Sequence, residues 1–182
     1  CISSLQQAHL PHGEILVGIC DNSPEHSNNS LHDGLLSLFG GCGTQVKAGL
    51  TLYGAADAGL RVFLYKSDLN AGFAAGNNSC LKASKDIGFS FTHCWFLNND
   101  TEIEKNCLHE MILKLQKKGA RTGVCGSTMI YYHDKRTIQA LGGSQYHPWT
   151  GTMQEIGNGQ QWPLAVDEAE IESRMSYVCG AS

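Results

Sequence analysis

The sequence predicts an α/β fold in which a mostly parallel sheet carries helices on both faces. Three short apolar runs, at residues 14–20, 61–65 and 94–97, have the composition of buried strands, and segments of helical character lie between or after them. Strands that alternate with helices in this way form parallel sheets. The length of 182 residues suits one core, so we expect residues 1–182 to form a single domain.

Each of the three predicted strands runs into polar residues. The first run (EILVGIC) is followed by residues 21–24 (DNSP), all of which are common turn formers. The second run (RVFLY) continues into residues 66–70 (KSDLN). The third run (CWFL) continues into residues 98–101 (NNDT).

Three segments are predicted to be helical. Residues 31–39 are the part of the Ser-, Asn- and Gly-rich stretch 25–60 with helical character. Residues 71–85 carry glycines near their start and helix formers later, which is typical of a loop that leads into a helix. Apolar residues recur at helical spacing over 108–115, and Gly119 suits the end of that helix.

The last third of the chain gives weaker patterns. Short strands are predicted at 122–125 and 129–132, and residues 142–143 (GG) suit a turn. Residues 144–163 are polar and are expected to be irregular. Residues 175–179 have the pattern of a final strand.

The polar residues after the three strands predict a ligand site. Parallel strands place their carboxyl ends at one edge of the sheet, where open α/β sheets bind ligands, so Asp21 and Asn22, Asn70, and residues 98–100 are expected to line one cleft. Mg²⁺ or Mn²⁺ takes one or two protein carboxylates and completes its shell with phosphate oxygens and water. This edge of the predicted sheet therefore suggests a site that binds a divalent cation together with a diphosphate. The alternative is that residues 98–101 form only a turn followed by a helix cap.

Charge and cysteine content argue against several classes of protein. The net charge of −4 and pI near 6.0 give no basic surface for nucleic acid or an anionic membrane. The eight cysteines contain no CxxC pair, which disfavours zinc ribbons and redox dithiols. Because Cys20, Cys94, Cys125 and Cys179 lie at apolar runs, we expect reduced core thiols of a cytosolic protein, with a disulfide left open. No apolar stretch approaches the roughly 20 residues of a membrane span.

Five blocks of the sequence, taken in order, resemble the family 2 glycosyltransferases. The nearest branch is that of the bacterial rhamnosyltransferase-type enzymes of surface polysaccharide assembly. The resemblance extends over residues 14–182. The blocks are residues 21–23 (DNS), 70–78 (NAGFAAGNN), 96–101 (FLNNDT), 142–143 (GG) and 177–182 (YVCGAS).

The resemblance implies a GT-A fold, which is a Rossmann-like α/β domain, and a transferase activity. Such an enzyme moves a sugar from a nucleotide-diphosphate donor, dTDP-rhamnose or similar, to a saccharide or lipid-linked acceptor, usually with inversion and with Mg²⁺ or Mn²⁺. It implies cell-surface polysaccharide synthesis, in the cytoplasm or at the inner face of the cell membrane.

The same resemblance assigns residues to the nucleotide. Asp21 contacts the base, and the glycine-rich segment lets the backbone pass close to the nucleotide. From the residues alone, an Asx turn at Asp21 and an ordinary glycine loop with a helix cap remain alternatives. The nucleotide-binding set is Asp21, Asn22, Asn70, Gly72, Gly76, Asn77, Asn98 and Asn99.

The metal and the acceptor are assigned in the same way. Residues 98–100 stand in the place of the family's DxD motif, with an amide in place of the first carboxylate, which leaves Asp100 as the metal ligand. The segment that lines the acceptor side matches Gly180, Ala181 and Ser182, for which a plain strand-end turn is the alternative.

The chain also departs from the family. The family's first strand lies before the point that matches Cys1, and its catalytic base lies beyond the point that matches Ser182. We therefore expect an internal piece, truncated at both ends and inactive alone, and name no catalytic residue because the base lies outside this chain.

Two other classes stay open. A non-catalytic nucleotide- or sugar-binding α/β module would bind without metal. An NAD-binding dehydrogenase domain is also a parallel α/β domain, although Gly72-x-x-x-Gly76 is not its GxGxxG motif.

Overall fold

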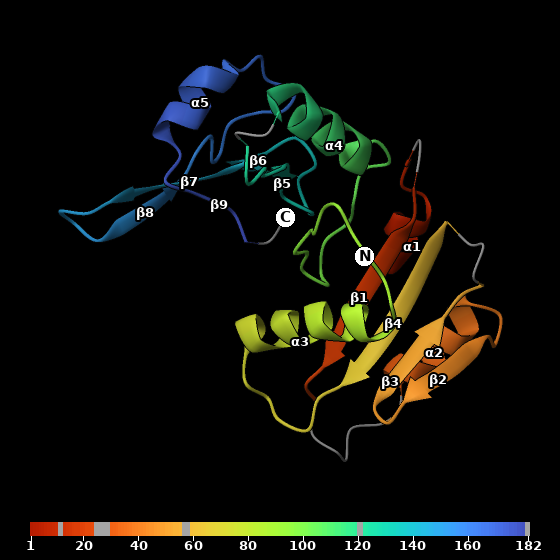
Figure 1. Cartoon of the computed structure of the whole chain (residues 1–182). Coiled ribbons are helices and arrows are strands. Elements are labelled where there is room, and N and C mark those ends of the chain that lie inside the picture. The colour runs from red at the N-terminus through yellow and green to blue at the C-terminus, as the bar shows by residue number, and fades with distance from the viewer. Residues whose placement is uncertain (11–12, 24–29, 56–58, 120–121, 181–182) are drawn as a thin grey trace. The chain divides into compact units, whose positions relative to one another are not determined.

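The computed structural model describes residues 1–10, 13–23, 30–55, 59–119 and 122–180 (Figure 1). The chain divides into two compact units. Unit 1 comprises Cys1–Pro11 and Trp95–Ser182, and unit 2 comprises His12–Cys94. The single domain expected over residues 1–182 stays a prediction.

Unit 2 contains a four-stranded mixed sheet in the order β1-β4-β3-β2. β1 pairs with β4 in parallel, with Ile15 opposite Leu60 and Asp21 opposite Lys66. β3 pairs antiparallel with both β4 and β2. The strands are β1 (Ile15–Asp21), β2 (Gly43–Lys47), β3 (Leu50–Tyr53) and β4 (Leu60–Lys66).

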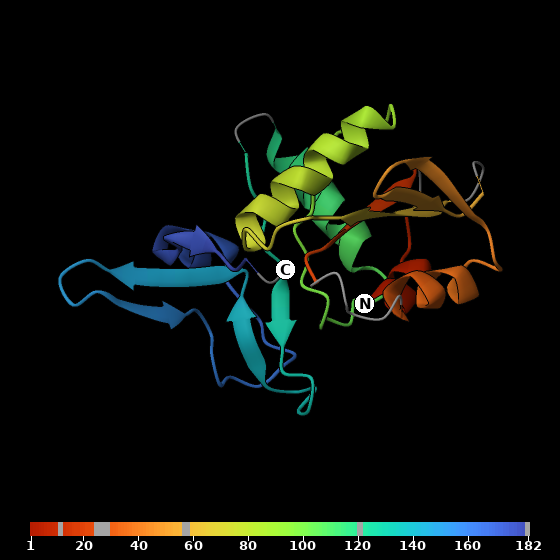
Figure 2. The ribbon, with the colours of Figure 1, turned by 90° about the horizontal axis from the view of Figure 1, so that it is seen from below.

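Helices lie on both faces of this sheet (Figure 2). α3 (Phe73–Asp86) covers one face, where Phe63 and Leu50 pack against it in the buried core of the unit. α2 (Ser30–Leu38) covers the other face, where its residue His32 contacts the buried ring of Tyr53. Because side chains alternate along a strand, β4 supplies apolar residues to both helices, which explains why its centre is buried.

In its described residues, unit 1 contains short strands and the helices α1, α4 and α5. β5 and β6 form an antiparallel pair, and β8-β7-β9 form an antiparallel three-stranded sheet. The strands are β5 (Thr128–Ile130), β6 (Ile138–Leu141), β7 (Gly143–His147), β8 (Thr152–Glu155) and β9 (Tyr177–Val178).

The helices of unit 1 are α1 (Ile2–Gln6), α4 (Cys107–Lys118) and α5 (Glu168–Arg174). α5 begins at Asp167, whose carboxylate accepts hydrogen bonds from two backbone N–H groups of its first turn. Ile171 and Met175, on and just after this helix, pack against a buried apolar cluster of Ile138, Leu141 and Ile156.

The structure confirms five of the predicted elements. The runs at 14–20 and 61–65 are β1 and β4, and the helices predicted at 31–39, 71–85 and 108–115 are α2, α3 and α4. The strand predicted at 129–132 corresponds in part to β5, and the strand predicted at 175–179 corresponds in part to β9.

The prediction of a mostly parallel sheet is wrong. Within the described residues β1–β4 is the parallel pairing, and the others are antiparallel. The antiparallel character of unit 2 comes from the β2–β3 hairpin, which the sequence analysis missed because its strand β2 is exposed and polar. Its turn contains Gly49, with φ of 71°.

Three other local predictions are wrong. The strands predicted at 94–97 and 122–125 are not assigned, and Phe96 is 42% exposed, so the first of these runs is not the buried strand that its composition suggested. An apolar run becomes a strand only where another strand offers hydrogen-bond partners. Conversely, residues 144–163 are not irregular, because they contain most of the β7–β8 hairpin.

No disulfide links any of the eight cysteines, all of which lie within the described residues. Cys20, Cys125 and Cys179 are partly buried, but Cys94 is exposed, so its placement in a core is wrong. A search of the described part of the chain finds no helix with the length and apolar character needed to cross a membrane.

Candidate functional site

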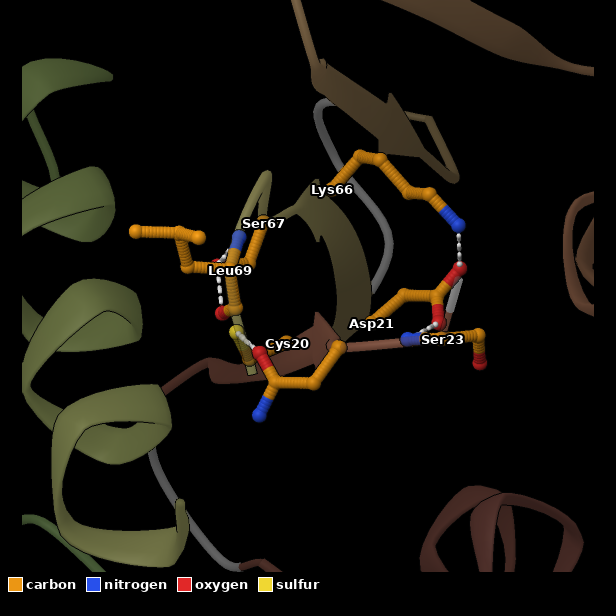
Figure 3. A network of polar contacts seen from close by, with 7 residues as sticks. Cys20, Asp21, Ser23, Lys66, Ser67 and Leu69 are labelled. Carbon is orange, nitrogen blue, oxygen red and sulfur yellow. Dashed lines mark hydrogen bonds and ion pairs between the residues drawn. The ribbon is translucent and has the colours of Figure 1, made fainter. Parts of the chain in front are cut away.

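The carboxyl ends of β1 and β4 meet at a polar cluster in unit 2 (Figure 3). Lys66 Nζ lies 2.8 Å from Asp21 Oδ2, and the backbone N–H of Ser23 donates to Asp21 Oδ1 at 2.9 Å. The backbone N–H of Ser67 donates to the carbonyl of Asp21 at 2.9 Å. The end of β1 is therefore held through both its main chain and its side chain.

These contacts change the acidity of Asp21. Burial raises the pKa of this carboxyl, but hydrogen bonds from Lys66 and Ser23 and the charge of Lys66 outweigh that effect, so its pKa lies below the ordinary value. The side chain of Asp21 is 15% exposed and that of Lys66 is 37% exposed. Asp21 is therefore an ionised hydrogen-bond acceptor near neutral pH.

Asn22 lies between β1 and α3. Its Oδ1 accepts a hydrogen bond from the thiol of Cys20 at 3.1 Å. A Cβ at Gly76 would lie 3.3 Å from Asn22 Nδ2, so the glycine leaves room for this amide. The structure thus brings together Asn22 and Gly76, which lie far apart in the sequence.

The loop from β4 to α3 carries the other predicted residues of this unit. Asn70 Oδ1 accepts a hydrogen bond from the backbone N–H of Gly72 at 3.2 Å. Gly72 is the N-cap of α3, with φ of 86° and ψ of −178°, a conformation open essentially to glycine alone. Asn77 lies within α3 and is partly buried.

The segment 98–100 belongs to unit 1, where it follows no strand. Thr101 Oγ1 donates to the carbonyl of Asn98 at 2.7 Å, which closes a turn. Asn99 and Asp100 line a pocket of about 410 Å³. Its full lining is Cys1, Ser3, Ser4, Gln7, Asn99, Asp100, Thr101, Glu102 and Tyr132.

The donor set of this pocket suits a hard cation, because carboxylate, amide and hydroxyl oxygens are the ligands that Mg²⁺ and Mn²⁺ prefer. Asp100 is exposed, whereas Glu102 is paired with Lys135 at 3.2 Å. Across the described residues, no group of three or more His, Cys, Asp or Glu side chains is placed to hold a metal ion. Asp100 thus lines the pocket as an exposed carboxylate, and its role as a metal ligand stays a prediction.

The predicted site residues fall into two groups. Asp21, Asn22, Asn70, Gly72, Gly76 and Asn77 lie in unit 2, and Asn98, Asn99 and Asp100 lie in unit 1. Gly180, the predicted acceptor residue after β9, is exposed and has open space around its Cα. Ala181 and Ser182 lie outside the described residues.

Sequence reasoning missed Lys66 as a member of the cluster. The residue was visible as the first of the polar residues after the second strand. Its significance depends on the register of β1 with β4, which places it opposite Asp21. A comparison of the chain with family models, with curated proteins and with solved structures gives no match.

Gly72 provides a test of the loop geometry. Replacing Gly72 by Ala should lower the free energy of unfolding by about 1–3 kcal/mol, because alanine is strained at this φ and ψ. The measurement is urea denaturation followed by circular dichroism. Gly34→Ala, in α2 with open space around it, is the matched control and should raise stability by up to about 1 kcal/mol. Equal effects of the two substitutions would contradict the assigned conformation.

The lowered pKa of Asp21 predicts how stability depends on pH. The stabilisation from its ionised form is fully present above the ordinary pKa of about 3.9 and is lost as the pH falls through the lower pKa of the folded state. Asp21→Asn should therefore cost about 1 kcal/mol at pH 7, the upper end for a partly exposed ion pair. Denaturation curves from pH 7 down to pH 3 should show this difference shrinking. A difference that is constant or grows toward acid pH would refute the assignment.

Proposed function

We propose that this chain is the donor-binding part of a family 2 glycosyltransferase with a GT-A fold. The observation that carries the proposal is the cluster at the carboxyl ends of β1 and β4, where Asp21 pairs with Lys66 and the next residue, Asn22, lies beside Gly76 of α3. The sequence blocks that resemble the family support it independently, since three of these residues belong to them.

Asp21 suits contact with a nucleobase. An ionised carboxylate only accepts hydrogen bonds, so it favours a base that presents an N–H group, such as uracil, thymine or guanine. Charge-assisted hydrogen bonds of this kind are stronger than neutral ones. In the proposal, Asp21 receives the base and Asn22 supports it from the side of α3.

The start of α3 suits a diphosphate. The first N–H groups of a helix and its dipole favour anions, and the N-cap Gly72 supplies no side chain that would compete for these groups. Glycine at this position also lets a ligand approach the backbone closely. Asn70, which fixes the N–H of Gly72, positions this turn.

The cation belongs to the pocket of unit 1 in this proposal. Within unit 1 alone, Asp100 with the amide oxygen of Asn99 would hold Mg²⁺ or Mn²⁺, a cation that when bound can also take phosphate oxygens as ligands. The donor would be dTDP-rhamnose or a similar nucleotide sugar, and the acceptor a saccharide or lipid-linked saccharide on the side of residues 180–182. The proposed setting is surface polysaccharide synthesis in the cytoplasm or at the inner face of the cell membrane.

Calorimetric titration with dTDP, UDP, GDP and NAD, each with and without Mg²⁺ or Mn²⁺, tests this function. We expect metal-dependent binding of one nucleoside diphosphate. Asp100→Ala should weaken that binding at least tenfold, which is about 1.4 kcal/mol, without unfolding the chain.

Glu110→Gln, on the exposed side of α4, is the matched control and should bind like the parent. Equal metal-dependent affinity of the Asp100→Ala variant and the parent would refute the role of Asp100. Binding of NAD alone would favour a dehydrogenase domain, and binding that needs no metal would favour a non-catalytic module.

A further inference from the structure

We propose that Lys66 is a positioning residue of the nucleotide site, which holds the Asp21 carboxylate in the orientation that receives the base. This inference rests on the function proposed above. It adds a residue that lies outside the sequence blocks that resemble the family.

The geometry gives the carboxylate two fixed contacts on different oxygens. Lys66 Nζ binds Oδ2 at 2.8 Å, and the N–H of Ser23 binds Oδ1 at 2.9 Å (Figure 3). Two contacts of this kind prevent the carboxylate from rotating about its terminal bond. Each carboxylate oxygen has about two acceptor positions, so one position on each oxygen stays available to a ligand donor.

The backbone around Lys66 is fixed as well. Lys66 is the last residue of β4, opposite Asp21 in the parallel register, and its own N–H donates to the carbonyl of Gly49 at 2.8 Å. The next residue, Ser67, donates to the carbonyl of Asp21. The ammonium group therefore extends from a strand that is hydrogen-bonded on both sides.

Burial of the carboxylate distinguishes this ion pair from the Lys47–Asp86 and Arg61–Glu14 pairs among the described residues of unit 2. The carboxylates of the Lys47–Asp86 and Arg61–Glu14 pairs are 38% and 49% exposed, whereas that of Asp21 is 15% exposed. Exposed pairs of this kind contribute little to a structure. A carboxylate that is largely removed from water depends more on its partner for ionisation and orientation.

Lys66 is also the positive charge that acts on Asp21. On β1 the neighbouring titratable group is Cys20, whose pKa is raised by burial and by the charge of Asp21, so this thiol is neutral near pH 7. Removing Lys66 should therefore raise the pKa of Asp21.

The test combines nucleotide affinity with its pH dependence. The nucleoside diphosphate that the parent binds, chosen from UDP, dTDP and GDP with Mg²⁺, is titrated into the parent, Lys66→Met and Lys66→Arg between pH 4 and pH 8. Lys66→Met should bind about tenfold more weakly at pH 7, because a charge-assisted contact to the base-binding group is lost. Its affinity should also begin to fall at a higher pH than that of the parent.

Two matched variants complete the experiment. Lys66→Arg keeps the charge and should restore both the affinity and the pH profile. Lys47→Met, which breaks the exposed pair with Asp86, should bind like the parent. NMR titration of the Asp21 carboxyl carbon gives a reading without any nucleotide, and its pKa should rise in Lys66→Met and stay low in Lys66→Arg.

The outcomes separate the two proposals. If the parent binds a nucleotide and Lys66→Met binds it equally well with an unchanged pH profile, the role of Lys66 is refuted while the proposed function stands. An unchanged pKa of Asp21 in Lys66→Met refutes it as well. If the folded parent binds no nucleotide, the proposed function fails, and the role of Lys66 fails with it.

Discussion

The parallel pairing of β1 with β4 is the constraint on which the candidate site depends. Its register places Asp21 opposite Lys66, and the N–H of Ser67 closes the end of the pair on the carbonyl of Asp21. α3 packs across both strands, so its first turns lie at the same end. Without this pairing, Asp21, Lys66 and Gly76 would be three unrelated residues of a polar surface.

The two strands that could be predicted, β1 and β4, have apolar residues that pack against a helix of the same unit. β1, β4 and α3 share one buried core around Phe63, so their periodicity is strong in the sequence. β2 could not be predicted, since its residues are exposed and its pairing with β3 is what makes it a strand. The strand predicted at 94–97 was wrong for the opposite reason. Its apolar composition suggested a buried strand, but composition alone does not provide a neighbouring strand as hydrogen-bonding partner.

In the candidate site, too, some residues could be predicted from the sequence and others could not. Asp21, Asn22 and Gly76 could be named from sequence blocks, and the structure adds that a Cβ at Gly76 would lie only 3.3 Å from Asn22 Nδ2, so the glycine leaves room for this amide. Lys66 could not be chosen among the polar residues 66–70, because its importance comes from the strand register and not from its neighbours in sequence. Asp100 was named from its motif, and the pocket around it comes from α1 and Tyr132, which no motif indicated.

The most direct test of the central claim, that the carboxyl end of the β1–β4 pair binds a nucleotide, is an NMR titration of backbone amides with UDP, dTDP and GDP in the presence of Mg²⁺. The account predicts saturable shifts at Asp21, Asn22, Gly72 and Gly76, while the amides of Gly43–Lys47 on β2 stay unchanged. Two results would contradict the account. One is saturable shifts that appear only at other amides and leave these four unchanged, and the other is the absence of shifts with all three nucleotides.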